Sequence, residues 1–138
     1  PLIQGAAGMR LHSAEFLRAA RALCDRHGLF LIFDEVMTGF GRSGELFACG
    51  RAGIAPDLMT LAKGLTGGLL PLAATAASEA IYAAFLGRQR SRAFFHGHSF
   101  TAHPIGCAVA LRSLELCLAE RVPARLEALG QRLHARLA

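Results

Sequence analysis

Two charged residues, Asp34 and Lys63, each follow an apolar run of the kind that forms a buried strand. The run 29–33 ends just before Asp34, and the run 58–62 ends just before Lys63. In open α/β sheets, ligands bind just outside the carboxyl ends of the strands. The sequence therefore predicts that both side chains emerge at a ligand-binding edge of a sheet.

Lys63 is the only lysine among the 15 Lys and Arg residues of the chain. Arginine keeps its proton near neutral pH, whereas a desolvated lysine can lose it. A free amine is the group that forms a Schiff base with a carbonyl compound. Lys63 is therefore the candidate nucleophile.

Asp34 and Lys63 are 63 − 34 = 29 residues apart, which is enough for one crossover between neighbouring parallel strands. A carboxylate beside a pyridine nitrogen and a lysine beside an aldehyde are what pyridoxal 5'-phosphate requires. The carboxylate keeps the ring nitrogen protonated, and the lysine holds the cofactor and can move a proton. Val36 would point the same way as Asp34 and pack on the ring. On spacing alone, the pair could equally be a structural salt bridge.

The elements that must position these residues alternate between strand and helix, which predicts an α/β fold with a mainly parallel sheet. Strands are expected at the end of residues 1–9 and over 29–33, 58–62 and 71–77. Helices are expected from Ser13 to Gly28, over 46–52, from Ser78 to about Leu86, from Pro104 and from Pro123. The continuous apolar run 29–33 suits a strand covered on both faces.

The last two predicted helices carry leucine stripes, Leu111, Leu114 and Leu118 on the first and Leu126, Leu129, Leu133 and Leu137 on the second. We expect each stripe to be buried on one side of its helix. A domain boundary is predicted near 121–123, so that residues 1–121 and 122–138 belong to different domains.

The composition limits the classes of protein to which the chain can belong. The chain of 138 residues is one domain or part of one, and its start at Pro1 suggests a fragment or a processed product. The apolar content of 53% suggests that part of the surface of this chain is apolar and is covered by further segments or by a partner subunit. The net charge of +5 includes no run of five like charges, and the arginine-rich segment 88–92 lacks interleaved aromatic residues. Nucleic-acid binding is therefore not favoured.

The same totals argue against a membrane protein and against a zinc site. No apolar stretch is long enough to span a bilayer. The four cysteines form no C-x-x-C pair, and each lies among apolar neighbours. We expect them to be small core residues in a reducing, cytoplasmic compartment.

Three segments together carry a family resemblance. Residues 34–44 read Asp-Glu-Val-Met-Thr-Gly-Phe-Gly-Arg-Ser-Gly, residues 55–57 Ala-Pro-Asp, and residues 61–68 Leu-Ala-Lys-Gly-Leu-Thr-Gly-Gly. This pattern closely resembles the class III aminotransferases of fold type I, and the resemblance extends over the whole chain. Segments 65–75 and 96–101 are most similar to the biotin-pathway branch of that class.

The resemblance implies roles for individual residues. Lys63 is the Schiff-base lysine, which also meets the substrate, and Asp34 pairs with the pyridinium nitrogen. Ser99, with the backbone at His98, reaches the phosphate of the partner subunit's cofactor, and Gly97 lies near the keto substrate. A homodimer with active sites at its interface follows from these roles.

The resemblance also implies an architecture and a reaction. Residues 1–121 would be the C-terminal half of the large cofactor-binding domain, and 122–138 the start of the small domain. The reaction would convert 8-amino-7-oxononanoate to 7,8-diaminononanoate, with S-adenosylmethionine or lysine as amino donor. Arg42 would brace its loop or meet the substrate, with bracing preferred. Because part of the site would lie outside these residues, we expect the chain to be inactive alone.

Three alternatives stay open on the sequence. His103, which precedes Pro104, is more typical of the ω-amino acid:pyruvate branch, so the substrate could be an ω-amino acid. His96 and His98 could share one face of a strand as a metal pair, although no third ligand accompanies them. The chain could also be an inactive, truncated product that only folds or only pairs with another chain.

Overall fold

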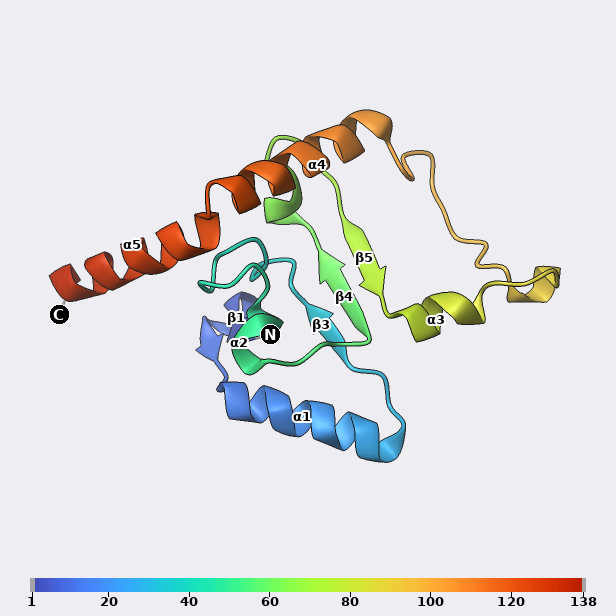
Figure 1. Ribbon diagram of the computed structural model, residues 1–138, viewed down its shortest axis with the longest axis horizontal. Helices are drawn as coiled ribbons and strands as arrows, with labels where there is room; N and C mark the ends of the chain where they lie inside the picture. The colour runs from blue at the N-terminus through green and yellow to red at the C-terminus, as the bar shows by residue number, and fades with distance from the viewer. Residues whose placement is uncertain (1, 138) are drawn as a thin grey trace.

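The computed structural model describes residues 2–137, which form an α/β fold (Figure 1). The strands are β1 Ile3–Gln4, β2 Arg10–Leu11, β3 Ile32–Asp34, β4 Leu58–Leu61 and β5 Ala74–Ala77. The α-helices are α1 Ala14–His27, α2 Ala48–Ala52, α3 Glu79–Ala84, α4 Pro104–Ala119 and α5 Val122–Leu137. Three short 3-10 helices complete the set: η1 Gly5–Ala7, η2 Lys63–Thr66 and η3 Arg90–Arg92. The predicted fold class is confirmed, and the α-helices and the main strands lie close to their predicted ranges.

The main sheet has the strand order β3-β4-β5. β3 and β4 are parallel neighbours, and Asp34 lies level with Thr60. β5 returns antiparallel to β4, with Leu61 level with Ala74. Within the described residues the sheet is therefore mixed, and its one parallel pair is formed by β3, which ends at Asp34, and β4, which precedes Lys63. β1 and β2 form a separate antiparallel pair.

Both ends of α1 follow from local sequence chemistry. The hydroxyl of Ser13 accepts a hydrogen bond from the Phe16 amide at 3.1 Å and satisfies a free amide of the first turn. Gly28 ends the helix in the left-handed region at φ 62°, where a residue without Cβ carries no steric cost. Both predicted helix boundaries are confirmed.

The core lies between α1, α2 and one face of the sheet. Leu17, Phe33, Cys49 and Ala52 form its buried cluster, around which half-buried apolar residues pack. The other face of β3 is open, since Ile32 is 60% exposed. The expectation of a strand covered on both faces is therefore wrong within the described residues, because alternate side chains of β3 point to opposite faces and the core covers only the face that includes Phe33.

The leucine stripes of α4 and α5 are not buried as predicted. Leu111 is 64% exposed and Leu118 is 56% exposed, and of the α4 stripe only Leu114 is partly covered. On α5, exposure rises from 38% at Leu126 to 86% at Leu137. The periodicity located the helices correctly, but within residues 2–137 nothing covers most of these apolar side chains.

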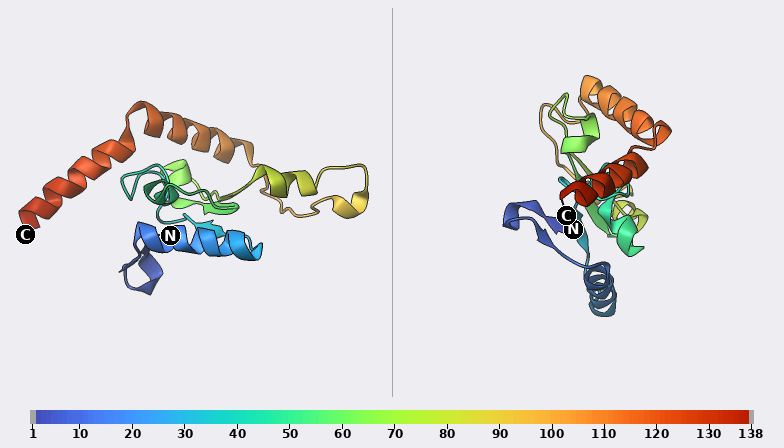
Figure 2. Two further views of the ribbon diagram at one scale, coloured as in Figure 1. Left: turned by 60° about the horizontal axis from the view of Figure 1, so that its bottom comes forward. Right: turned by 90° about the vertical axis from the view of Figure 1, so that its left-hand side faces the viewer.

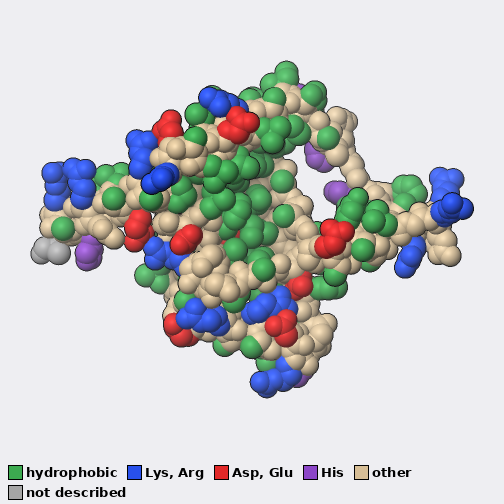
Figure 3. Space-filling model, in the orientation of Figure 1, with side chains coloured by type: hydrophobic (Ala, Val, Ile, Leu, Met, Phe, Trp, Pro, Cys, Tyr) green, Lys and Arg blue, Asp and Glu red, His purple; other side chains and the backbone are tan. Residues whose placement is uncertain are grey.

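α1 and α4 lie on opposite sides of the sheet, and α5 continues beyond α4 toward the C-terminus (Figure 2). Residues 85–103, between α3 and α4, project from the body as an exposed segment that contains η3; we call it the arm. Figure 3 shows apolar side chains gathered over the middle of one face, with arginines and acidic residues toward its ends. No helix of residues 2–137 has the length and apolar character needed to cross a bilayer.

Asp57 links α1 to the entry of β4. Its Oδ2 accepts hydrogen bonds from Arg21 Nη1 at 2.7 Å and from the Leu31 amide at 2.7 Å. These bonds, the Leu31 amide first and then the Arg21 guanidinium, lower the pKa of the Asp57 carboxyl below its ordinary 3.8. Asp57 therefore fixes the start of β4 relative to β3 by a charge-assisted contact.

This contact predicts an acid sensitivity. Because the folded-state pKa of Asp57 lies below its unfolded value, its stabilisation is fully present above about pH 4 and is lost as the pH falls through the folded-state pKa. The urea midpoint should fall with decreasing pH in this range, and it should fall less in Asp57→Asn. Equal falls in the two proteins, measured by circular dichroism, would contradict the assignment.

Candidate functional site

Asp34 and Lys63 leave the sheet at the carboxyl ends of neighbouring parallel strands. Asp34 is the last residue of β3, and its Oδ1 accepts hydrogen bonds from the Val36 amide at 3.0 Å and from Thr60 Oγ1 at 3.4 Å. Lys63 follows two residues after the end of β4 and begins η2. Both side chains are exposed. The topology thus brings an acid and an amine to one edge of the sheet, where a ligand of an α/β fold would bind.

Val36 lies in the turn that follows β3, which ends at Asp34. Strand alternation therefore does not extend to Val36, and the packing of its side chain on a cofactor ring stays a prediction. Its amide instead closes a short turn on the Asp34 carboxylate, which is the usual reason for an Asp at such a position. This bond fixes the carboxylate relative to the chain that leaves the strand.

The backbone at Lys63 is strained. Its φ is 36°, a region that side-chain-bearing residues adopt rarely and at a cost of about 1–3 kcal/mol. The Leu65 amide donates to the Ala62 carbonyl at 2.8 Å, which tightens the turn around Lys63. At the end of η2, buried Thr66 donates its hydroxyl to the Leu70 carbonyl at 2.7 Å. Such strain persists where the surroundings over-determine it, and it marks Lys63 as a position under constraint.

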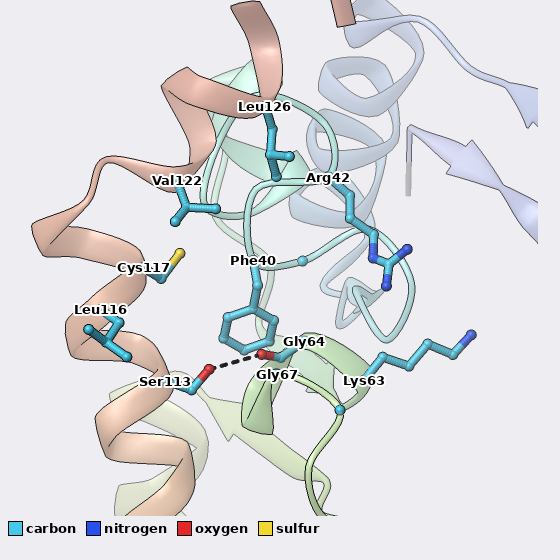
Figure 4. A pocket seen from close by; sticks show the side chains of 12 residues that line it. Phe40, Arg42, Lys63, Gly64, Gly67, Ser113, Leu116, Cys117, Val122 and Leu126 are labelled. Atoms are coloured by element: carbon cyan, nitrogen blue, oxygen red, sulfur yellow. Dashed lines mark hydrogen bonds between the residues drawn. The ribbon is translucent and has the colours of Figure 1, made fainter. Parts of the chain in front are cut away.

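A cavity of about 700 Å³ lies beside this turn, lined by the loop after β3, by η2, by α4 and by α5. Figure 4 shows its residues. Apolar side chains, among them Leu116 and Leu126, occupy the helical side, while Phe40 stands in the middle. The side chains of Arg42 and Lys63 extend together on the opposite side. The two cationic groups therefore border a largely apolar hollow.

Arg42 makes no hydrogen bond or ion pair within the described residues, so the loop-bracing role expected of it is not seen. Arg51 braces the loop instead. Its Nε donates to the Ser43 carbonyl, and its Nη2 forms an ion pair with Glu127 of α5 at 2.7 Å. Arg42 lies exposed at the border of the cavity, where a ligand anion could meet it.

Glu35 is the residue that sequence reasoning missed. It is 0% exposed, and its carboxylate accepts hydrogen bonds from Thr38 Oγ1 at 2.5 Å, from the Ala48 amide at 3.0 Å and from the Cys49 amide at 2.9 Å. The two amides belong to the first turn of α2, so Glu35 ties both ends of the loop between β3 and α2. The sequence did carry a signal for this role. Glu35 lies in the predicted loop with Thr38 three residues later and with no basic residue nearby to pair with.

Glu35→Gln should lower the free energy of unfolding by about 1–3 kcal/mol, because the amide supplies one acceptor oxygen fewer and buries two donors. Urea denaturation measures the change. Glu45→Gln is the matched control, since Glu45 lies exposed on the same loop and should change stability little. Equal losses in the two variants would contradict the role given to Glu35.

Two of the four cysteines are buried as expected, whereas Cys24 and Cys107 are only partly buried. Cys49 and Cys117 are buried and all four are free thiols. Burial, and for Cys49 also the nearby Glu35 carboxylate, raises the pKa of both buried thiols. A raised pKa keeps each group protonated, and a protonated thiol is a poor nucleophile.

Segment 96–99 lies on the arm, apart from η2 within this chain (Figure 1). His96, Gly97, His98 and Ser99 are all exposed. The His98 amide donates to Thr101 Oγ1 at 2.8 Å, and the His98 Nδ1 accepts from the Phe100 amide at 3.2 Å. No strand forms here, so His96 and His98 do not share a strand face. The structure therefore does not bring this segment to Lys63 of the same chain.

His103 has a local structural function. Its Nδ1 accepts a hydrogen bond from the Gly106 amide at 3.1 Å and caps α4 ahead of Pro104. An Asn side chain can make the same cap. The identity of this residue is thus accounted for by helix capping, without reference to a substrate.

The chain matches a known family along its whole length. The model of the family "Aminotransferase class-III" matches residues 1–138. The chain belongs to the class III aminotransferases. Membership of this class implies pyridoxal 5'-phosphate as cofactor and the fold type I architecture.

The named relatives carry two different names. An adenosylmethionine-8-amino-7-oxononanoate aminotransferase of Geobacter sulfurreducens is 55% identical over 127 residues, which are 91% of this chain and 28% of that protein. An omega-aminotransferase of Caulobacter vibrioides is 46% identical over 114 residues, 82% of this chain and 26% of that protein. The chain thus spans less than a third of the length of these curated relatives.

A solved structure supports the fold. An amine transaminase from an uncultivated Pseudomonas species, in its PLP-bound internal aldimine form, has a TM-score of 0.89 and 42% identity over 95% of this chain and 30% of that one. Asp34 and Lys63 supply the donor set that such a cofactor needs, a carboxylate for the ring nitrogen and a primary amine for the aldehyde, at one sheet edge. The residues present fit the group.

Proposed function

We propose that this chain is part of a longer enzyme that transfers an amino group to 8-amino-7-oxononanoate and yields 7,8-diaminononanoate, a step of biotin biosynthesis. The observation that carries the chemistry is the placement of Asp34 and Lys63 at the ends of neighbouring parallel strands. The substrate rests on the relative from Geobacter sulfurreducens that bears this activity in its name.

Each of the two residues has a definite task in this reaction. When bound, pyridoxal phosphate supplies a ring that accepts electrons from the substrate carbon. Lys63 Nζ would hold the cofactor through its aldehyde and, when the substrate frees it, would take up and return the proton at the reacting carbon atoms. Asp34, whose Oδ1 accepts hydrogen bonds from the Val36 amide and Thr60 Oγ1, would pair with the ring nitrogen and keep it protonated.

The remaining contacts of the site involve other residues and a second subunit. Val36 would pack on the ring, and Arg42 at the border of the cavity would meet an anionic group of the substrate. Ser99 and the backbone at His98 would reach the phosphate bound by the partner of a homodimer, with Gly97 near the keto substrate. The projecting arm supports this part of the proposal, since it carries these groups away from the body of its own chain.

The domain division follows the same proposal. Residues 1–121 would complete the large domain, and 122–138 would begin the small one. The break between α4 and α5 supports this boundary, because Arg121 has φ 50° and interrupts the helix. The exposed apolar faces of α4 and α5 would be covered by further polypeptide, and the enzyme would act in the cytoplasm.

The decisive experiment is an assay of the full-length gene product with 8-amino-7-oxononanoate and either S-adenosylmethionine or lysine as donor. Formation of 7,8-diaminononanoate, detected by mass spectrometry, is expected with one of the two donors. No product from either donor would remove the biotin assignment. The 138-residue chain tested alone is expected to be inactive, as a truncated chain that only folds or pairs would also be.

A second candidate substrate is an ω-amino acid with pyruvate as acceptor. The 46% identity to the omega-aminotransferase of Caulobacter vibrioides favours it. Alanine formation from pyruvate and an ω-amino acid, in the absence of diaminononanoate formation, would establish this candidate. Both candidates use the same cofactor and the same roles for Asp34 and Lys63.

A further inference from the structure

We propose that Phe40 is a positioning residue that aims Lys63 by packing directly on Gly64. The inference rests on the proposed function, since it concerns the amine that would bind the cofactor. The contact joins the loop after Asp34 to the turn that carries Lys63. The same loop therefore affects both residues of the candidate site.

The contact between Phe40 and Gly64 leaves no space for a side chain at Gly64. A Cβ at that position would lie 2.8 Å from Phe40 Cβ, 2.9 Å from Cδ2 and 3.1 Å from Cγ. The φ of Gly64 is not positive, so its backbone does not adopt the left-handed conformation. Glycine is therefore required here by the presence of Phe40 and not by the backbone torsion.

Phe40 is itself held firmly. Its φ is 61°, and its amide donates to the Leu46 carbonyl at 2.6 Å. Its ring meets the edge of Phe47 at a centroid distance of 5.6 Å and an interplanar angle of 74°. One residue earlier, the Gly39 amide donates to the Glu35 carbonyl at 2.9 Å, so the buried Glu35 anchors this part of the loop.

Gly64 is also linked to α4. Ser113 Oγ lies 3.5 Å from the Gly64 carbonyl oxygen, as the dashed line in Figure 4 shows. Phe40 of the loop and Ser113 of the helix therefore both contact Gly64. The residue immediately before it is Lys63, whose strained φ of 36° requires such support.

A loss of this support should misdirect the amine without burying it. Lys63 is exposed, so a small reagent reaches it in any orientation, whereas attachment of a bound cofactor requires the correct aim. A displacement of about 1 Å at a reacting group can lower a rate by roughly 100-fold. Two reactions of the same lysine can therefore distinguish a change in the orientation of its amine from a change in its exposure.

The test exchanges the two side chains in the full-length protein. Gly64→Ala introduces the clash, and the double variant Phe40→Gly with Gly64→Ala removes it, with a glycine that suits the positive φ of residue 40. Gly130→Ala is the matched control, because a Cβ there meets nothing within 4 Å. The readouts are the rate at which borohydride traps pyridoxal phosphate on Lys63, found by peptide mass spectrometry, and the rate of reductive methylation of Lys63 by formaldehyde.

We expect Gly64→Ala to lower the rate of cofactor trapping about 10- to 100-fold, to leave the methylation rate within about twofold, and to be largely rescued in the double variant. Gly130→Ala should match the unaltered protein. Two results would overturn the proposal. One is cofactor trapping in the double variant, folded or not, that is no faster than in Gly64→Ala. The other is cofactor trapping at the original rate in Gly64→Ala. Cofactor trapping requires no keto acid. A protein that traps the cofactor as expected but transfers no amino group would therefore contradict the proposed function and not the role of Phe40.

Discussion

Lys63→Ala is expected to lower amino transfer by at least about 1,000-fold, because one substitution removes both the amine that binds the cofactor and the group that moves the proton. Lys63 is the only lysine of these 138 residues. The measurement is the single-turnover rate of the full-length protein loaded with pyridoxal phosphate.

Lys63→Arg is the control that retains a positive charge at the same position. Arginine keeps its proton near neutral pH and so cannot bind an aldehyde, and the loss should be as large as in Lys63→Ala. If Lys63→Arg retained most of the activity, Lys63 would act through its charge and the proposed chemistry would be incorrect.

Asp34→Asn should lower amino transfer by roughly 10- to 150-fold, since a hydrogen bond to a charged group contributes about 1.5–3 kcal/mol and the neutral amide no longer stabilises a protonated ring nitrogen. The shape of the side chain is retained, as is an oxygen for the Val36 amide. Stability should therefore change little, which separates this variant from one that unfolds.

The control for Asp34 is Asp25→Asn, which removes an exposed carboxylate on α1 that pairs with Arg21. Activity should be unaffected there. An Asp34→Asn protein with activity close to that of the unaltered enzyme would mean that Asp34 serves only the turn after β3 and the hydroxyl of Thr60.

The sequence predicted what depends on local pattern. Ser13 and Gly28 delimit α1 as expected, and the apolar runs before Asp34 and Lys63 became parallel neighbours. These features depend on residues close in the chain or on the rule that ligands meet strand ends. Helix periodicity also located α4 and α5, although it could not say which apolar side chains would be covered.

What the sequence did not predict depends on contacts between distant segments. The burial of Glu35 follows from α2 folding back over the loop, 13 and 14 residues later in the chain. The contact of Phe40 with Gly64 and the ion pair of Arg51 with Glu127 likewise join segments that no local pattern relates. The alternation argument for Val36 does not apply, because β3 ends at Asp34, two residues before Val36.

The arm has a practical consequence for handling the protein. It carries Arg88, Arg90 and Arg92 in an exposed segment between two helices, and trypsin cleaves after arginine in such accessible backbone. A cut there would leave the sheet in one piece and α4 in the other. Resistance to digestion would then report that a second molecule shields the segment, which makes limited proteolysis an inexpensive assay of assembly.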